Sequence, residues 1–389
     1  MYGSLRAAGA IAAAVSLLAG FVMPASARQI IDLGSPDLFP IYGYGINSSR
    51  EIAGSYTANN GNDTKAFRWS SATGFTDLGS LSGPSGNYSV AYAINSGGIV
   101  VGESVTPSGD RHAFRYGGSG VMEDLGTLGG TTSTAYAISD SGIIVGSSQN
   151  NLGSTEAFVY SNAIMNGIGT LGGDFSEARG VNANGVIVGT ASNGLENRAF
   201  LYTGSTMTDL LGQATVGNSS ANAVAGNFVV GQFADGTDER AYLFDFGTAT
   251  FTDLGTLGGQ NSVARAVTAS GIVVGQADDG VEQRAFIYDR TGAGGMEDLT
   301  TVLSAQSSGW TMLTDVYGVT DQGYLVGSGI RNGETHVFAV LQPVPAPPAA
   351  VSLIIGAGTA VLGYGTRRLR RARNMKNKRH EDRWDTIGR

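Results

Sequence analysis

The chain has 389 residues, of which 60 are glycine, none is cysteine and only 14 % carry a charge, and its formal net charge is −8. Glycine is about twice as frequent as in an average protein, and this composition excludes a coiled coil, a helical bundle and a charged disordered chain. The absence of cysteine excludes a disulfide framework, a thiolate metal site and a cysteine nucleophile.

The first 27 residues have the three parts of a secretory signal peptide. Arg6 supplies a basic start, residues 7–22 form an apolar stretch, and Ala25 and Ala27 form a small-residue cleavage motif. An uncleaved anchor helix is the alternative, but the apolar run is short and rich in alanine. We therefore expect cleavage after Ala27 and export of the rest of the chain.

A pattern of four short segments recurs seven times between residues 30 and 340. The clearest segment contains an Ala-Phe pair or a variant of it, and its aromatic residue recurs at intervals of 47, 44, 42, 42, 44 and 52 residues. A second segment ends in glycine, a third begins with Asp-Leu-Gly or a variant, and a fourth alternates small and larger residues, as in Ala91-Tyr92-Ala93. The glycines of the second segment are Gly54, Gly102, Gly146, Gly189, Gly231, Gly275 and Gly327.

Each segment is four to seven residues long, rich in β-branched or aromatic residues and bounded by Gly, Asn, Asp or Ser, which is typical of β-strands. Four strands in about 44 residues match the period of a β-propeller blade, whereas a β-helix turns over in about half that length. The sequence therefore predicts an all-β fold, a seven-bladed β-propeller of about 28 strands that spans residues 28–342.

Crowding predicts the order of the strands within a blade. Blades converge on a central axis, so we expect the segment with the smallest side chains, such as Ala91 and Ala93, to be innermost. The segment that ends in glycine follows, then the Ala-Phe segment, and the Asp-Leu-Gly segment lies at the rim. The chain opens with a single rim segment, residues 30–34, and its last complete segment is of the Ala-Phe type. The first strand is therefore expected to complete the last blade and close the ring.

Aromatic residues make up 8 % of the chain, and most lie in the strand segments. We expect these side chains to pack in the core. Trp310 stands outside the repeat pattern, in an insertion of the last unit at residues 304–314. We expect it to pack beneath the closing blade, although a loop with a role of its own is the alternative.

The repeats resemble the extracellular HAF repeat, whose His-Ala-Phe stands here as His112-Ala113-Phe114. The Asp-Leu-Gly-Thr-Leu-Gly-Gly signature occurs intact at residues 124–130 and 253–259, and the resemblance covers about 310 residues. It implies a secreted or surface repeat protein. The family brings no catalytic residue to carry over.

Turns rich in acidic and amide side chains join the second and third strands of several repeats. Two of these turns bring together Asp235 with Asp238, and Asp278 with Asp279. Oxygen ligands of this kind make calcium binding the alternative role for these turns. Neither turn has the spacing of an EF-hand loop, and Asp-Gly is itself a preferred hairpin turn. We therefore expect turn formation here, and the sequence predicts no catalytic residue and no cofactor.

Few residues are suited to catalysis or to nucleic-acid binding. Of the three histidines, His112 and His336 occupy equivalent repeat positions that also accept Lys, Glu and Arg, and His380 lies in the basic tail. The rim aspartates occupy equivalent positions in successive blades, whereas glycoside hydrolysis needs two carboxylates about 5–10 Å apart. Residues 28–366 carry 13 basic and 29 acidic side chains, so nucleic acid, which requires a basic face, is excluded as a partner.

The end of the chain has three parts. Residues 343–348 are rich in proline, which keeps this segment extended. Residues 349–366 contain no charged side chain and are close to the length of a helix that spans a bilayer. Residues 367–389 carry ten basic and three acidic side chains, so the positive-inside rule leaves this tail in the cytoplasm. A buried helix of a soluble domain is the alternative, and the adjoining arginines argue against it.

This order of Pro-rich motif, apolar helix and arginine cluster resembles the C-terminal sorting signals of the PEP-CTERM family. The residues that carry the resemblance are Val344, Pro345, Pro347, Arg367, Arg368, Arg370 and Arg371. The resemblance implies a Gram-negative bacterium that makes exopolysaccharide, and an exosortase-like enzyme that processes the exported protein at the membrane. The family motif usually has glutamate where Ala346 stands, and sixteen residues follow the arginines here. A retained membrane anchor is therefore the alternative to processing.

The sequence favours an exported, non-enzymatic protein at the cell surface or outside the cell, associated with biofilm or exopolysaccharide. Its expected partners are the sorting enzyme and the membrane, and extracellular polysaccharide or surface proteins are further candidates. The alternative is an extracellular polysaccharide hydrolase or lyase with its site on a propeller face. That alternative needs polar groups from several blades to converge, and the near-identity of the repeats argues against it.

Overall fold

The computed structural model describes these stretches of the chain: residues 30–34, 41–58, 61–83, 86–117, 120–215, 217–292, 294–305 and 309–342. The expected signal peptide, Pro-rich motif, C-terminal helix and basic tail lie outside these stretches. In the part of the chain that is described, no helix is long and apolar enough to cross a membrane.

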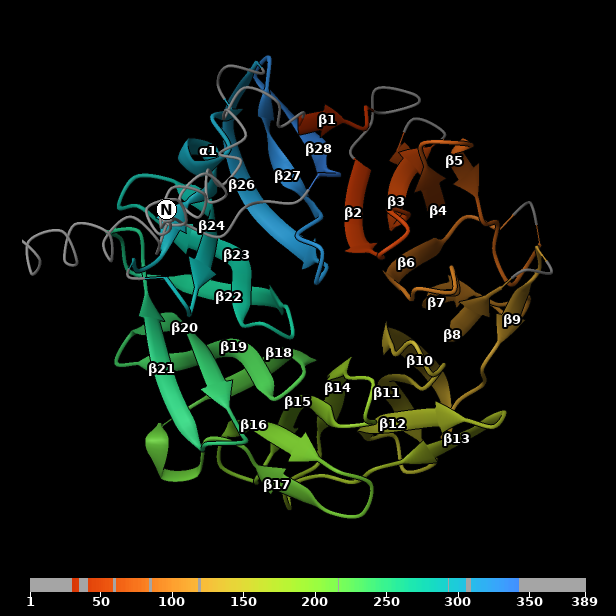
Figure 1. Ribbon diagram of the computed structural model, residues 1–389. Coiled ribbons are helices and arrows are strands. Elements are labelled where there is room, and N and C mark those ends of the chain that lie inside the picture. Colours follow the sequence, from red (N-terminus) through yellow and green to blue (C-terminus); the bar gives the residue numbers. More distant parts are fainter. Residues whose placement is uncertain are drawn as a thin grey trace, which may run out of the picture.

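Within the described residues, 28 strands form seven four-stranded antiparallel sheets around a central axis (Figure 1). Each sheet is one blade, which confirms the predicted seven-bladed β-propeller. The first strand of each blade contacts the first strands of both neighbouring blades, so this strand is innermost, as its small side chains predicted. The innermost strands are β2 (Ile41–Ile46), β6 (Ser89–Ile94), β10 (Gly129–Ile138), β14 (Ser176–Val181), β18 (Ser219–Ala225), β22 (Ser262–Val267) and β26 (Trp310–Val319).

The second strand of each blade pairs its repeated glycine with the repeated aromatic residue of the third strand. A Cβ atom on Gly54 would lie 2.8 Å from the Phe67 ring, so glycine is needed for the ring to fit. The second strands are β3 (Ile52–Ala58), β7 (Val100–Val105), β11 (Ile144–Asn150), β15 (Ile187–Ser192), β19 (Phe228–Asp235), β23 (Ile272–Asp278) and β27 (Leu325–Arg331). The third strands are β4 (Asp63–Ser70), β8 (Arg111–Tyr116), β12 (Thr155–Ser161), β16 (Asn197–Tyr202), β20 (Asp238–Asp245), β24 (Gln283–Asp289) and β28 (Glu334–Val340).

The fourth strands form the rim, as predicted for the Asp-Leu-Gly segment. The leucine after the aspartate is buried, as with Leu78 and Leu125, and anchors the rim to the core. The rim strands are β5 (Gly74–Asp77), β9 (Met122–Asp124), β13 (Ile164–Gly167), β17 (Met207–Asp209), β21 (Thr250–Gly255), β25 (Glu297–Asp298) and β1 (Ile30–Asp32).

The ring is closed by the first strand of the chain, as predicted. The last blade has the order β1-β28-β27-β26, and Ile30 lies opposite Val340 in an antiparallel pairing. The Asp32 carboxylate fixes this strand, because it accepts a hydrogen bond from the Arg331 guanidinium at 2.5 Å and contacts the His336 ring nitrogen at 3.1 Å. The first and last strands of the propeller are thereby joined within one sheet.

A serine at the start of an innermost strand joins each of several blades to the blade before it. Ser176 is fully buried, and its Oγ accepts a hydrogen bond from the Ala157 backbone N–H at 2.8 Å while donating to the Gly169 carbonyl at 2.6 Å. The same backbone N–H of the Ala-Phe segment reaches the equivalent serine of the following blade at Ser89, Ser133, Ser219 and Ser262. These bonds are one reason why small polar residues precede the innermost strands.

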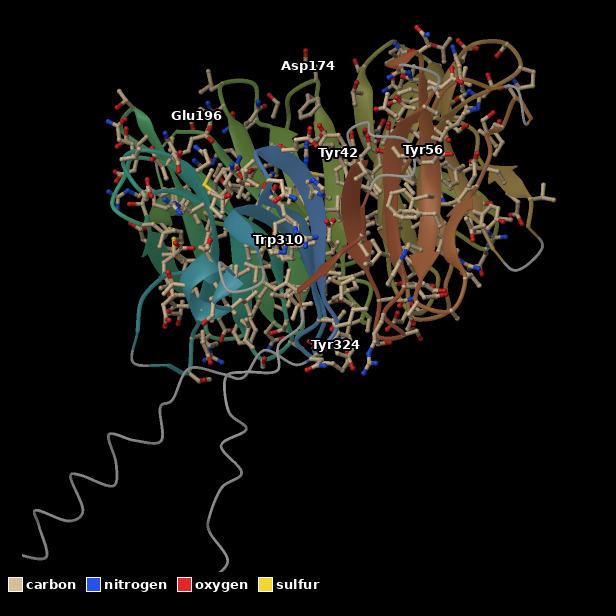
Figure 2. All side chains as sticks on the ribbon, turned by 90° about the horizontal axis from the view of Figure 1, so that it is seen from above. Tyr42, Tyr56, Asp174, Glu196, Trp310 and Tyr324 are labelled. Carbon is tan, nitrogen blue, oxygen red and sulfur yellow. The ribbon has the colours of Figure 1, made fainter. Side chains whose placement is uncertain are left out.

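The propeller has two faces, which we call upper and lower. The upper face carries the turns between second and third strands, where Glu196 lies, and the lower face carries the turns between first and second strands, where Tyr324 lies (Figure 2). Strand β1 begins, and strand β28 ends, at the lower face, because Ile30 pairs with Val340 and Val340 with Leu325 at the start of β27.

Two short helical segments depart from the repeat pattern. Helix α1 (Leu299–Val302) precedes the last blade and begins after Asp298, whose side chain accepts the Thr300 N–H. A 3-10 turn at Gly212–Ala214 follows the rim strand of blade 4. Trp310 is 1 % exposed and packs edge-to-face on Phe338, with ring centroids 5.9 Å apart. It therefore packs in the core of the closing blade, but as the first residue of β26 rather than in an insertion outside the repeat.

Candidate functional site

A central channel opens at the lower face. A cavity of 290 Å³ is lined by aliphatic residues from the ends of six first strands, namely Ile46, Ile94, Ile138, Ala225, Val267 and Val319. An adjoining cavity of 380 Å³ shares Ile138 and Ala225 and adds Val181 from the remaining blade. All seven innermost strands therefore contribute to the mouth of the channel.

The rim of this lower mouth is polar and is held together by bonds between blades. The Asn47 amide donates to the Asn95 carbonyl at 2.9 Å, and Asp140 accepts the Ser96 N–H at 2.8 Å. The charged side chains among the described residues that line the two cavities are Asp140 and Asp321. Each carboxylate accepts a backbone N–H of the preceding blade, so both have a structural use.

Each innermost strand bulges two residues before the aliphatic mouth residue. In the first blade Gly43 pairs with Gly54 and Gly45 with Ala53, which leaves Tyr44 between them without a partner in the ladder. A bulge of this kind re-aims the side chain of the extra residue. The seven residues at this position, which we call the channel belt, are Tyr44, Tyr92, Tyr136, Arg179, Asn222, Arg265 and Tyr317.

Small residues next to the belt allow the innermost strands to approach each other. A Cβ atom on Gly45 would lie 3.1 Å from the Ala93 Cα of the neighbouring strand, and one on Gly180 would lie 3.0 Å from the Ala223 Cα. Both contacts are tighter than ordinary van der Waals distance. This close approach brings the belt side chains of adjacent blades within reach of one another.

Four tyrosines of the belt form a continuous aromatic arc. The ring centroids of Tyr317 and Tyr44 are 5.7 Å apart, those of Tyr44 and Tyr92 5.6 Å, and those of Tyr92 and Tyr136 5.5 Å. Tyr42 stacks on Tyr44 from the upper side at 6.0 Å and is 38 % exposed. The arc spans blades 7, 1, 2 and 3, and the exposed Tyr42 extends it toward the upper face.

An arginine lies at each end of the aromatic arc. The Arg179 guanidinium is 5.3 Å from the Tyr136 ring centroid, and the Arg265 guanidinium is 5.7 Å from that of Tyr317. These are cation–π distances. Six consecutive belt residues are thus in contact around the channel, from blade 6 through the ring closure to blade 4.

Each of these arginines has a carboxylate partner from its own or the next blade. Arg179 Nε is 2.5 Å from Glu177 Oε1, and Arg265 Nη2 is 3.0 Å from Asp315 Oδ2. Asn222 completes the belt and donates to Gln232 Oε1 at 2.9 Å. One side of the belt is therefore aromatic, and the other is polar with its charges balanced.

Burial keeps the belt tyrosines in their neutral form. Desolvation raises the pKa of Tyr44, Tyr92, Tyr136 and Tyr317 above the usual value of 10. Burial also raises the pKa of Asp315, while Arg265 acts in the opposite direction. At neutral pH the tyrosine hydroxyls are uncharged hydrogen-bonding groups.

A second polar cluster lies beside the arc, toward the upper face. Glu103, which is 8 % exposed, accepts hydrogen bonds from the Tyr88 hydroxyl at 2.5 Å and from Thr134 Oγ1 at 2.7 Å. The Arg111 guanidinium covers the Tyr88 ring at 3.9 Å. The glutamate raises the pKa of Tyr88, in addition to a larger effect of burial. The Tyr88 ring is therefore held in place at the edge of the belt.

The turns that sequence analysis weighed for calcium use their carboxylates locally. Asp279 accepts two backbone N–H bonds at 2.8 Å and one from the Arg284 guanidinium, and Asp278 accepts a backbone N–H of its own turn. Asp235 lies 3.1 Å from an arginine nitrogen, and Asp238 accepts a hydroxyl bond. In the described part of the chain, no group of three or more His, Asp or Glu side chains is placed to hold a metal ion.

The two repeat histidines of the propeller lie far from the belt, at the blade rim. His112 Nδ1 is 2.9 Å from the rim carboxylate of Asp124. In the third blade Glu156 replaces the cationic residue and Gly167 replaces the aspartate, and a Cβ atom on Gly167 would lie 2.3 Å from the Glu156 carboxylate. The rim aspartates thus pair within their own blades, and none of the sequence-predicted site residues in the described part of the chain lies in the channel.

The belt was not predicted from the sequence. The aromatic residues of the strands were expected to pack in the core, which holds for the Ala-Phe segment but not for Tyr44, Tyr92, Tyr136 and Tyr317, which are only half-buried on the innermost strands. A signal was present, because the residue between the two small positions varies among Tyr, Arg and Asn while its neighbours stay small. The direction in which these side chains point could not be read from the sequence, because a bulge interrupts the alternation that assigns residues to the two faces of a strand.

The protein is a seven-bladed propeller with tyrosines on the innermost strands. Comparisons with known proteins support the fold and do not identify a function. No family model matches the chain, and no curated protein matches it in sequence. Similar solved structures include a puromycin-hydrolysing peptidase of Mycobacterium tuberculosis, with a TM-score of 0.51 and 12 % identity over 80 % of this chain and 53 % of that one. An oligogalacturonate lyase in complex with manganese has a TM-score of 0.50 and 10 % identity over 81 % of this chain and 93 % of the lyase.

A structure from work on two prolyl endopeptidases has a TM-score of 0.50 and 12 % identity, over 77 % of this chain and 49 % of that one. The chain therefore spans about half the length of the puromycin-hydrolysing peptidase and of the prolyl endopeptidase chain. At such identities the likeness concerns the propeller fold, which hosts many unrelated functions.

Proposed function

We propose that the protein is an exported, non-enzymatic binding propeller of the cell surface, which holds an extracellular ligand at the channel belt. The observation that carries this proposal is the difference between the belt and the other repeat positions. The structural positions keep one residue type from blade to blade, as the aromatic residue and the glycine of the second strand do. The belt position has three residue types, sorted into an aromatic arc and a polar arc.

Structural demands do not account for this sorting. The seven bulges have the same place in the register, so the backbone makes the same demand on each belt residue. A ring that needed only to be filled would accept one residue type throughout. Convergent aromatic and polar groups in a concave region are the usual features of a ligand site. An asymmetric ligand would explain why the two arcs differ.

The positions of the first and last strands of the propeller support display with the upper face outward. Strands β1 and β28 meet at the lower face, and the structure is described up to residue 342. If the helix expected at residues 349–366 lies in the membrane, the six residues between reach at most about 20 Å. The lower face would then lie near the membrane, and a large ligand would approach the belt from the upper face, past Tyr42.

The second candidate is a polysaccharide hydrolase or lyase with its site in the same channel. The observation that favours it is Asp315, a carboxyl with a raised pKa at the belt, as a general acid requires. The fold alone does not decide between the candidates. The contact of Asp315 with Arg265 at 3.0 Å favours binding, because the ion pair stabilises the charged form of the carboxyl and opposes the effect of burial on its pKa.

The test is incubation of the purified full chain, in detergent, with exopolysaccharide from its own host. We expect the polymer to co-sediment with the wild type and to lose this binding with Tyr44→Ala. The control Tyr202→Ala, at a half-buried tyrosine on the third strand of blade 4, should retain it. The molar mass of the polymer, measured by light scattering, should stay constant. A falling molar mass with new reducing or unsaturated ends, lost in Asp315→Asn, would establish the enzyme instead.

Export is tested separately in whole cells. Leu195 lies in an upper-face turn and is 94 % exposed, so an epitope tag inserted beside it should not disturb the fold. Protease added to intact cells should remove the tag if the propeller is displayed. A tag that is cleaved only after lysis would contradict surface display.

A further inference from the structure

We propose that the ligand of the channel belt is an uncharged polysaccharide chain, bound through its sugar faces and hydroxyl groups. This inference rests on the proposed function and names the chemical class of its ligand. It follows from three properties of the belt: the aromatic arc, the mixed donors and acceptors of the polar arc, and the balance of charge.

The aromatic arc offers a surface for the apolar face of a sugar ring. Four tyrosine rings with centroids 5.5–5.7 Å apart follow the channel wall, and Tyr42 extends the surface toward the upper opening. A pyranose ring carries C–H groups on its face and hydroxyl groups around its edge. Tyrosine matches both, since it has an apolar ring and a polar tip.

The opposite arc offers both donors and acceptors. Arg179 and Arg265 present N–H groups, and Glu177 and Asp315 present carboxylate oxygens beside them. A hydroxyl group needs one acceptor and can accept from one or two donors. A sugar with its face on the tyrosines therefore directs its hydroxyl edge toward paired donors and acceptors.

The balance of charge favours an uncharged ligand. Each belt arginine already contacts a carboxylate, and Asp315 is 5 % and Glu177 14 % exposed in their side chains. A uronate or phosphate group bound to either arginine would lie beside one of these carboxylates, and the repulsion between the two negative charges would weaken its binding. The lower mouth adds Asp140 and Asp321, which repel anions further.

Two other ligands with flat or apolar surfaces fit less well. A nucleic acid would stack on tyrosine, but its phosphates would meet a region in which acidic side chains outnumber basic ones by 29 to 13 over residues 28–366. A Pro-rich peptide also docks on aromatic rings. It has few side-chain hydroxyls for the polar arc to bind, so that arc would be left without partners.

The experiment is calorimetric titration of the full chain, purified in detergent, with hexasaccharides of equal length. The neutral probes are cellohexaose, maltohexaose, mannohexaose and xylohexaose, and the anionic probe is hexagalacturonate. We expect at least one neutral probe to bind about tenfold more tightly than the anionic one. Removing one aromatic anchor by Tyr92→Ala should weaken that binding about tenfold or more, whereas Tyr92→Phe, which keeps the ring, should retain most of it.

Tyr202→Ala serves as the matched control and should leave binding within about twofold of the wild type. A thermal melt checks that each variant is folded, and Tyr92→Phe keeps the test decisive if Tyr92→Ala is not. Tighter binding of hexagalacturonate, or of a decaproline peptide, would refute the inference while leaving a channel ligand in place. Absence of binding by all neutral probes, or binding that neither Tyr92 variant alters, would also overturn it.

Discussion

Ser176 lies at a junction between two blades, and its replacement by alanine should destabilise the propeller by about 2 kcal/mol. The Oγ atom accepts the buried Ala157 N–H at 2.8 Å and donates to the Gly169 carbonyl at 2.6 Å. Ser176→Ala leaves the N–H of a fully buried residue without an acceptor, which costs about 1–3 kcal/mol. The bond to Gly169 is partly buried, so water can replace part of it and the total stays near the middle of that range.

The size of the propeller sets the expected shift in melting temperature. An unfolding entropy of about 2.1 cal/mol/K per residue gives about 0.65 kcal/mol/K for a domain of about 310 residues. A loss of about 2 kcal/mol then lowers Tm by about 3 °C. Far-UV circular dichroism during urea and thermal unfolding of the full chain measures both quantities. Hydrogen exchange at the Ala157 amide should accelerate in the same variant.

Ser205→Ala is the matched control, because Ser205 is exposed in a turn of the same blade. This control should change the stability by less than about 0.5 kcal/mol. If Ser176→Ala were as stable as Ser205→Ala at an unchanged urea dependence, the serine would not carry the junction. Our explanation of the serines that open the innermost strands would then be wrong.

Three further predictions concern ring closure, alkaline stability and the tail. Hydrogen bonds from Gly34, Arg331 and His336 outweigh the effect of burial and hold the pKa of Asp32 below its usual value. Its contribution to stability is thus present above pH 3.8 and lost as the pH falls through the lowered pKa. Asp32→Asn should therefore be less stable than wild type in urea at pH 7, by roughly 1–3 kcal/mol, and this difference should vanish in acid. Burial raises the pKa of the belt tyrosines, so their contribution is present below pH 10 and lost above it. Tyrosinate absorbance from the belt should consequently appear only above pH 10, together with unfolding, and full ionisation at pH 10 in the folded protein would contradict this. If the tail is a sorting signal, replacing both Pro345 and Pro347 with alanine should block processing, as read from an epitope tag after Met375; a tag that remains on full-length wild-type protein would show that the segment is an anchor.

The pattern of residues within one repeat was enough to predict the architecture of the propeller. Gly54 and Phe67 belong to different segments, yet a glycine pairs with an aromatic residue in every unit. A Cβ atom at each of these glycines would lie 1.8–2.2 Å from a backbone carbonyl oxygen of the innermost strand, so only glycine fits there. The small residues next to the belt marked the innermost strand for a comparable reason, because neighbouring strands approach within van der Waals contact there. The unpaired rim segment at residues 30–34 predicted how the ring closes. The glycine–aromatic pair and the small residues next to the belt lie within one repeat and recur seven times, so chance variation in one copy does not obscure them.

The candidate site depended on relations that no single unit contains. Only the closed ring brings Tyr317 of the last blade against Tyr44 of the first, at opposite ends of the propeller sequence. Only the bulge turns these side chains toward the axis, because it interrupts the alternation from which the face of a residue is read. The sequence by itself thus determined the blade, its strand order and its closure, since these follow from local packing. The tertiary structure decided which variable side chains converge, since convergence follows from ring geometry and from a backbone irregularity that the residue pattern does not display.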